Sequence, residues 1–178
     1  MRTLKYAILG LLMRKKMSGY DLNKEFNTAL IEFWSAKHSQ IYPELKKLLA
    51  EELVEYKVEI SGDVLEKKIY SITEKGRKEF LEWLNRDDII DPTPKDVFRL
   101  RMYFSENLAD EDIIKLLDSQ IKQHRQKLAH LEDANNGFET IPQKGTYEFT
   151  DYIVLQSAIM RENNYIQWLN LCKQFYQK

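Results

Sequence analysis

The chain has 178 residues, of which 43% are hydrophobic and 31% charged, and its formal net charge is −1 at pH 7. These proportions are typical of a protein that folds and stays in water, as one domain or as two small ones, and the near-neutral total does not by itself indicate nucleic acid. The longest apolar run, within residues 6–13, is far shorter than the roughly 20 residues of a membrane span. It also lacks the flanks of a secretory signal, so we expect a cytoplasmic protein with no membrane partner. The single cysteine, Cys172, excludes an intrachain disulfide.

Two helices are predicted first. Residues 4–16 repeat apolar side chains at steps of three and four and end on basic residues, which suit a helix C-terminus. A second helix is predicted to begin after Ser18, a good N-cap, with Asp21 three residues further on. Its inward side is predicted to carry Leu22, Phe26 and Ala29.

A third helix is predicted over residues 34–48, and its two sides differ in chemistry. The apolar side carries Ile41, Leu45 and Leu48. The other side carries Ser39, Tyr42 and Lys46, and the one carboxylate in residues 34–48 is that of Glu44. Pro43 is expected in or near the first turn, where its missing N–H costs least. A hydroxyl, an aromatic ring and a cation form an unusual surface to show only to water.

After the third helix the period changes to two. Residues 53–60 alternate apolar and charged side chains, as a half-buried strand does. A turn is predicted at Ser61, Gly62 and Asp63, and residues 64–72 return as the partner strand. Thr73 is predicted to cap a fourth helix over residues 74–84.

The second half of the chain is predicted to be helical. Residues 86–95 contain two prolines and three aspartates and are predicted to link a domain at 1–85 to one at 96–178. A short aromatic helix is expected over 96–104, and two long amphipathic helices over about 110–135 and 148–176. Each of these two helices carries a row of apolar residues along one side, its apolar seam. Two such helices cannot cover both seams well alone, so a second subunit is expected to cover part of them. The predicted dimer interface consists of Ile113, Leu117, Ile121, Leu128, Leu131, Ile159, Ile166 and Leu169.

Three helices followed by a hairpin is the order of a winged helix-turn-helix, so the predicted fold is mainly α with a small β-hairpin wing. In such folds the third helix enters the major groove of DNA. Ser39, Gln40 and Tyr42 can contact phosphates or base edges, and Lys46 can neutralise a phosphate. Further phosphate contacts are predicted at Ser18 and Tyr20, at a helix N-terminus, and at Lys67 and Lys68 of the wing. The alternative is a winged-helix module that uses this surface against another protein, without operator DNA.

The segments "LKYAILGLL", "SGYDL", "FWSAKHSQIYPELKKLLAEELV" and "KKIYSITEKGRKEFLEWL" together resemble the PadR family of bacterial transcriptional regulators. The segments "DVFRLRMYF" and "RENNYIQWL" resemble the helical C-terminal domain of its larger members. The chain departs from the family at Glu52, where a glycine commonly ends the third helix. The resemblance implies a homodimeric repressor of a two-fold-symmetric double-stranded operator, released by an effector. It implies DNA contacts at Ser18, Tyr20, His38, Ser39, Gln40, Tyr42, Lys46, Lys67 and Lys68.

The segment "FWSAKHSQIYPELKKL" is similar to the subgroup that represses phenolic acid decarboxylase genes and is released by phenolic acids. A small aromatic acid needs ring surfaces and a cation for its carboxylate. The predicted effector pocket consists of Trp83, Phe98, Arg99, Arg101, Tyr103, Tyr152, Arg161, Tyr165 and Trp168. Two alternatives stay open: such an aromatic stripe can be core, and such an arginine can pair with Glu162 of a second subunit.

No pattern of catalytic residues is present in the sequence. The three histidines, His38, His124 and His130, and the one cysteine lack the spacing of a metal site. No glycine-rich phosphate loop or dinucleotide motif is present, so we expect no cofactor, no metal and no enzymatic activity. His124 lies on the apolar seam, where it is either an interface residue or, paired across a dimer, a pH sensor.

Overall fold

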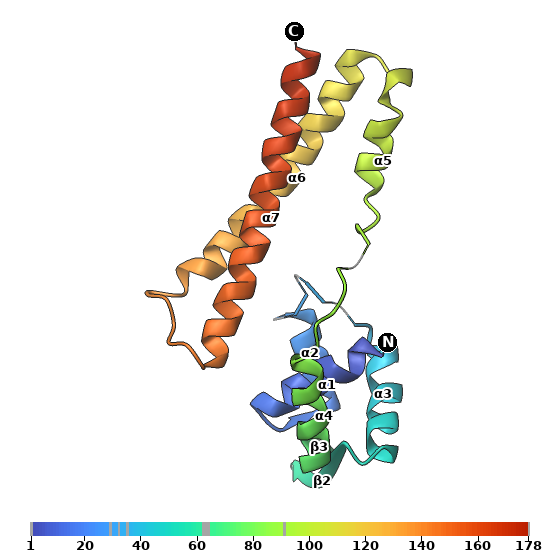
Figure 1. Cartoon of the computed structure of the whole chain (residues 1–178), viewed down its shortest axis with the longest axis vertical. Coiled ribbons are helices and arrows are strands. Elements are labelled where there is room, and N and C mark those ends of the chain that lie inside the picture. Colours follow the sequence, from blue (N-terminus) through green and yellow to red (C-terminus); the bar gives the residue numbers. More distant parts are fainter. Residues whose placement is uncertain are drawn as a thin grey trace. The chain divides into compact units, whose positions relative to one another are not determined.

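The computed structural model of the chain describes residues 2–28, 30, 31, 33, 34, 36–61, 65–90 and 92–177. It divides the chain into two units, Met1–Ile90 and Asp91–Lys178 (Figure 1). Ala29, predicted to point inward, and residues 62–64 of the predicted turn and return strand lie outside the described residues. Across the described ranges, none of the helices combines the length and the apolar character needed to cross a bilayer.

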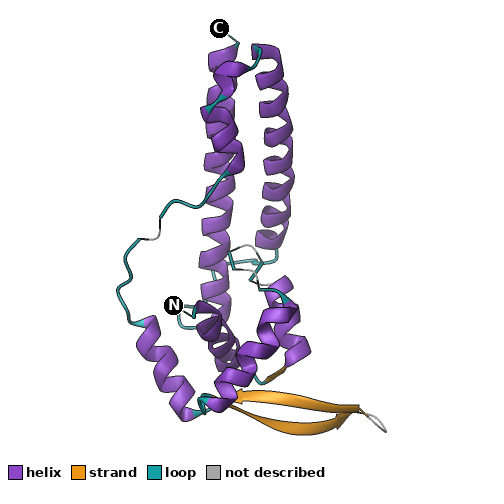
Figure 2. Cartoon of the chain, turned by 90° about the vertical axis from the view of Figure 1, so that its right-hand side faces the viewer, coloured by secondary structure: helices purple, strands orange, loops and turns teal. Residues whose placement is uncertain are grey.

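The first unit has the predicted order of three helices, a hairpin and a fourth helix. Its elements are α1 (Thr3–Arg14), β1 (Met17–Ser18), α2 (Gly19–Asn27), α3 (His38–Ala50), β2 (Val54–Ser61), β3 (Leu65–Ile72) and α4 (Glu74–Leu84). β2 and β3 pair antiparallel, with Tyr56 opposite Tyr70, and form a wing that extends beyond the helices (Figure 2). The strand β1 was not predicted; it adds two residues to the other edge of β3. The winged helix-turn-helix prediction is thus confirmed.

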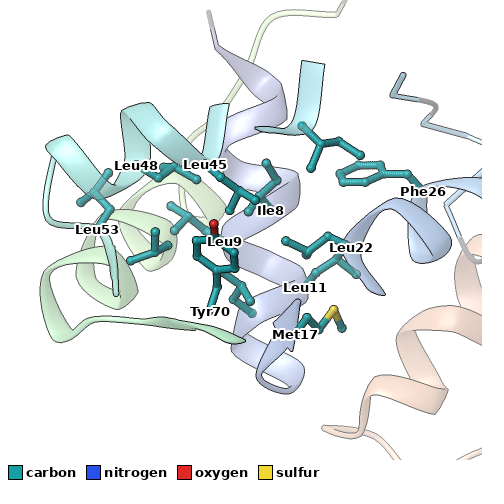
Figure 3. Packing of buried hydrophobic residues seen from close by; sticks show 13 residues of the cluster. Ile8, Leu9, Leu11, Met17, Leu22, Phe26, Leu45, Leu48, Leu53 and Tyr70 are labelled. Atoms are coloured by element: carbon teal, nitrogen blue, oxygen red, sulfur yellow. The ribbon is translucent and has the colours of Figure 1, made fainter. Parts of the chain in front are cut away.

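The hydrophobic core of this unit lies between α1, α2, α3 and the base of the wing (Figure 3). It contains Ile8, Leu9, Leu22, Phe26, Ile41, Leu45, Leu48, Leu53 and Tyr70, all almost fully buried. The apolar sides predicted for the three helices are therefore the sides that meet. Their burial fixes which side of α3 remains outside.

α3 begins at His38, four residues later than predicted. Pro43 is its sixth residue and lies in the second turn, so it is near the first turn, as predicted. Because Pro43 has no N–H, the carbonyl of Ser39 lacks its usual helical donor. Ser39 is exposed, so water can satisfy that carbonyl.

Glu52 ends α3 in the conformation that a glycine adopts most easily. Its φ is +57°, in the left-handed region. The N–H of Leu53 donates to the carbonyl of Leu48 at 2.9 Å, and the N–H of Glu52 donates to the carbonyl of Leu49 at 3.0 Å. These two bonds form a Schellman motif, so the missing glycine leaves the end of the helix intact.

Replacing Glu52 with Gly is expected to raise the free energy of unfolding by about 0.5–1 kcal/mol, because the left-handed conformation strains any residue with a Cβ atom. The Glu52 side chain is exposed, and its ion pair with Lys75 is a surface contact of small value. Urea unfolding of the two proteins measures the difference. Glu52→Ala is the control, since it removes the same carboxylate and keeps the strain.

The second unit is a helical hairpin with one added helix. Its elements are α5 (Val97–Tyr103), the 3-10 turn η1 (Ser105–Asn107), α6 (Asp110–Asn136) and α7 (Tyr147–Tyr176). α6 and α7 run side by side in opposite directions (Figure 1). α5 packs on α7, where the ring of Phe98 meets that of Trp168 edge-on at 6.2 Å.

Most of the residues predicted at the dimer interface are instead buried within one chain. These are Ile113, Leu117, Ile121, Leu131 and Leu169. The seams of α6 and α7 face each other because the connection over residues 137–146 lets the chain fold back on itself. Leu128, Ile159 and Ile166 are only partly buried and stay candidates for contact with a second subunit.

Candidate nucleic-acid interface and ligand cavity

The outward side of α3 gathers all the residues that were predicted there. His38, Ser39, Gln40, Tyr42 and Lys46 are all exposed. The rings of His38 and Tyr42 pack against each other, with centroids 4.8 Å apart. This surface therefore offers hydroxyl and amide donors, an aromatic pair and a cation along one helix.

The acidic residue of the helix points the opposite way. Glu44 is buried on the core side of α3, and its Oε1 accepts a hydrogen bond from Arg2 Nε at 3.0 Å. Arg2 also binds Glu51, the residue that follows the last residue of α3. The carboxylate of Glu44 is thus neutralised inside the unit, and the outward side of α3 keeps its positive and polar character.

Gln40 has one half of its side chain already engaged. Its Oε1 accepts a hydrogen bond from the backbone N–H of Lys37 at 3.0 Å, which caps the first turn of α3. The Nε2 amide can still donate outward. Gln40 is therefore suited to hydrogen-bond acceptors such as phosphate oxygens and the acceptor atoms of base edges.

Ser18 is a buried capping residue, and this corrects its prediction as a DNA contact. It is only 3% exposed. Its Oγ accepts the N–H of Asp21 at 3.1 Å and donates to Asp21 Oδ2 at 2.6 Å. The hydrogen bond from Ser18 is the main cause that lowers the pKa of Asp21, with Lys67 adding to it. Ser18 thus holds the N-terminus of α2 in place and leaves the surface to Tyr20, which is exposed.

Gly19 brings α2 and α3 into close contact at this surface. A Cβ atom on Gly19 would lie 2.7–2.8 Å from two ring carbons of Tyr42 and 2.9 Å from its hydroxyl oxygen. Only a residue without a side chain lets the Tyr42 ring lie across the first turn of α2. The position of Tyr42 therefore depends on a glycine of the neighbouring helix.

Gly19→Ala is expected to lower DNA affinity about tenfold, since the added methyl group moves the Tyr42 ring and one good side-chain contact to DNA accounts for about 1–3 kcal/mol. The displaced group is the end of a flexible side chain, so the fold should survive. Fluorescence anisotropy with labelled DNA measures the affinity. Gly10→Ala is the matched control, because its Cβ would press on Phe80, away from α3, at 3.1 Å.

The wing lysines both have partners within the unit. Lys67 Nζ lies 3.3 Å from Asp21 Oδ2 and ties the wing to α2. Lys68 Nζ lies 4.5 Å from the centroid of the Tyr56 ring. A phosphate near Lys67 would therefore compete with Asp21 for the same ammonium group.

The second unit contains an open cavity of about 670 Å³ beside α5 and α7. Four of the residues predicted for the effector pocket line it: Arg99, Arg161, Tyr165 and Trp168. The rings of Tyr165 and Trp168 meet edge-on at 5.2 Å. The guanidinium carbon of Arg99 lies 5.3 Å from the centroid of Tyr165 and 5.8 Å from that of Trp168. Two rings and two guanidinium groups suit a small aromatic acid.

The other five predicted pocket residues lie elsewhere. Trp83 belongs to the first unit, where it stacks on Tyr6 at 4.7 Å. Phe98 is a buried core residue, and Tyr152 packs against Phe138. Tyr103 lines a neighbouring cavity of about 610 Å³, and Arg101 is exposed outside the cavity.

Two acidic groups near the cavity were not predicted as site residues. Asp96 Oδ2 accepts a hydrogen bond from the Tyr165 hydroxyl at 2.7 Å. Burial and this hydrogen bond raise the pKa of Tyr165. Glu162 is buried and lies 2.6 Å from His124 Nδ1 and 3.1 Å from an Arg161 nitrogen. Burial pushes the pKa of Glu162 up, but hydrogen bonds from His124 and Arg161 outweigh it and lower that pKa.

Arg161 and His124 both have an acidic partner within the chain. Arg161 pairs with Glu162. His124 likewise finds Glu162 within the chain and stacks on Tyr165 at 4.1 Å. The only signals in the sequence were the place of His124 on the seam and the adjacency of Arg161 and Glu162. Asp96 carried a signal for an N-cap but none for a site.

Comparison with known proteins places both units in one family. The model of the transcriptional regulator PadR-like family matches residues 8–82, and the model of the C-terminal part of virulence activator alpha matches residues 94–177. The negative transcriptional regulator PadR of Bacillus subtilis (strain 168) is 42% identical over 172 residues, which cover 95% of this chain and 94% of that protein.

Two solved structures of the same relative are similar over nearly the whole chain. Bacillus subtilis PadR in complex with operator DNA has a TM-score of 0.95 at 40% identity and covers 98% of this chain and 99% of that chain. Bacillus subtilis PadR in complex with p-coumaric acid has a TM-score of 0.89 at 38% identity and covers 99% of this chain and 100% of that chain. The chain belongs to the PadR family of transcriptional regulators.

Proposed function

We propose that this chain is a homodimeric repressor that binds a two-fold-symmetric DNA operator through α3 and leaves it when a small aromatic acid binds the second unit. The outward side of α3 carries the DNA part of this proposal. Its donors, rings and cation are exposed, and its one carboxylate is turned inward to Arg2. The structural match to a relative in complex with operator DNA supports the same role.

On the DNA, the residues divide into two kinds of contact. Ser39, Gln40 and Tyr42, in the first turns of α3, read base edges in the major groove or bind the adjacent phosphates. Lys46, Tyr20 and the wing residues Lys67 and Lys68 contact the phosphate backbone. Phosphate contacts fix the position of α3, and base contacts select the sequence. His38 supports the Tyr42 ring and completes the set.

A second copy of the chain is the partner of the exposed apolar side of α7. Ile153, Met160 and Leu171 recur at steps of 7 and 11 residues on the side of α7 turned away from α6, and all three are exposed. A row of apolar side chains of this length is unusual on a monomer and typical of a subunit interface. Two copies place two α3 helices on successive major grooves, roughly 34 Å apart.

The effector is a planar aromatic acid such as p-coumaric acid. Its ring fits against Tyr165 and Trp168, and its carboxylate pairs with Arg99 or Arg161 at the cavity. The relative in complex with p-coumaric acid supports this chemistry. Effector binding releases DNA by favouring a dimer whose two α3 helices no longer match the groove spacing.

A binding assay on DNA from upstream of the protein's own gene cluster tests the proposal. Affinity should fall steeply with salt, because each neutralised phosphate releases counterions. Addition of p-coumaric acid should lower the affinity further, and benzyl alcohol, which lacks a carboxylate, should not. If no local promoter fragment binds at low salt, the protein is not an operator-binding repressor.

A further inference from the structure

The carboxylate of Asp96 joins three groups at the start of the second unit. Its Oδ1 accepts the backbone N–H of Arg99 at 2.9 Å and so caps α5. Its Oδ2 accepts the Tyr165 hydroxyl at 2.7 Å and lies 3.3 Å from Arg99 Nε. Asp96 also directly follows the segment that connects the two units along the chain. One side chain thus links that connection, α5 and α7.

Both side-chain partners of Asp96 line the cavity. Arg99 is one of its two guanidinium groups, and Tyr165 is its phenol. Burial pushes the pKa of Asp96 up, but hydrogen bonds from the Arg99 backbone and the Tyr165 hydroxyl outweigh it and lower that pKa. Asp96 is therefore a carboxylate at neutral pH. The arginine and the hydroxyl available to an acid in the cavity, Arg99 and Tyr165, are thus already bound to Asp96.

We propose that Asp96 is an internal competitor of the effector: the acid group of an aromatic acid displaces Asp96 from Arg99 and Tyr165, and this displacement alters the first turn of α5. The inference rests on the proposed function, since it assumes an aromatic acid in this cavity. It adds a residue that sets both the affinity for the effector and its effect on DNA binding.

The other acid at the cavity is held too firmly to play this part. Glu162 has a side chain only 4% exposed, and His124, Arg161 and Lys127 all lie within 3.6 Å of its oxygens. The side chain of Asp96 is 23% exposed, and Arg99 is its cationic partner among the residues that the structure describes. Separating a buried carboxylate with three cationic partners, such as Glu162, from those partners costs more free energy than displacing a partly exposed carboxylate such as Asp96. The effector therefore exchanges with Asp96 and leaves the Glu162 cluster in place.

The position of Asp96 explains how such an exchange reaches the first unit. A ligand shifts a conformational equilibrium only through contacts that differ between two states. Asp96 supplies that difference, because it loses Arg99 and Tyr165 only when another acid takes them. The freed side chain belongs to the residue at which the connection between the units enters α5. By reciprocity, operator DNA weakens effector binding by the same factor.

Asp96→Asn tests the inference, because asparagine is an equally good N-cap but carries no charge. Its one oxygen can accept the Arg99 N–H, and its amide nitrogen then faces Tyr165 and donates to the hydroxyl oxygen. Titration calorimetry should show p-coumaric acid binding about tenfold tighter than to the wild type, since the competing charge is gone. Anisotropy on the operator should show that the factor by which p-coumaric acid weakens DNA binding falls toward one. Asp96→Ser, which also caps and removes the charge, should behave alike.

Asp112→Asn is the matched control. Asp112 stands in the first turn of α6 and, like Asp96, pairs with a cation three residues on, Lys115, at 3.0 Å, but Lys115 does not line the cavity. It should leave both measurements unchanged. Unchanged effector affinity and full release of DNA in the two Asp96 variants would overturn the inference. If p-coumaric acid neither binds the wild type nor weakens its DNA binding, the proposed effector is wrong, and the inference fails with it.

Discussion

Tyr42→Ala is expected to weaken operator binding by about 100-fold. A good side-chain contact to DNA accounts for about 1–3 kcal/mol, and a dimer presents Tyr42 twice. The ring also packs on His38 and lies over Gly19, so its loss disturbs the place where α2 and α3 meet. Fluorescence anisotropy measures the affinity. The salt concentration is kept the same for both proteins, because counterion release makes the affinity depend on salt as well as on the lost contact.

The dimer should be unaffected, since Tyr42 lies in the first unit on an exposed surface. Sedimentation of the variant at the concentration used for binding verifies this. Tyr103→Ala is the matched control, because Tyr103 is an exposed tyrosine of the second unit. A Tyr42 variant that binds the operator as the wild type does would remove α3's outward side from the interface, and one that sediments as a monomer would give Tyr42 a different role.

Comparing Gly19→Ala with Tyr42→Ala distinguishes the effect of moving the Tyr42 phenol from the effect of removing it. The first variant keeps the phenol and moves it, and the second removes it. If both changes act only through Tyr42, the double variant should bind no more weakly than Tyr42→Ala alone. An additive loss would mean that the backbone of α2 makes its own contact with a phosphate.

The sequence was sufficient for features that depend on neighbours along the chain. The spacing of Ile41, Leu45 and Leu48 decides which side of α3 is buried, and these residues are buried. Ser18 and Asp21 are three residues apart, and they form the predicted capping box. In each case the residues on which the prediction depends lie within a few turns of one helix.

The sequence was insufficient where distant segments meet. Ser18 is a capping residue in any fold, but its burial comes from the pairing of β1 with β3, about fifty residues away. Tyr165 and Asp96 are 69 residues apart, and no local pattern joins them. The seams of α6 and α7 have the same apolar spacing whether a neighbouring helix belongs to the same chain or to a second copy.

Met160→Asp combined with Leu171→Asp is expected to split the dimer and to weaken operator binding by at least about 1000-fold. Each charge would be buried unpaired in the interface at a cost of several kcal/mol, and each appears twice. Both side chains are well exposed in the single chain, at 64% and 46%, so the subunit itself should fold. Because Met160 also lines the cavity, the binding measurement is made without effector.

Sedimentation velocity measures the oligomeric state, and the salt dependence of DNA binding gives a second readout. A single subunit neutralises about half as many phosphates, so its slope of log affinity against log salt should be about half that of the dimer. Leu81→Asp with Leu84→Asp is the matched control, since these α4 leucines are 45% and 55% exposed in the first unit. A stable dimer of the Met160 and Leu171 variant would move the interface to the side of the helices that carries Leu128, Ile159 and Ile166, whereas a control that also dissociates would show that α4 takes part in it.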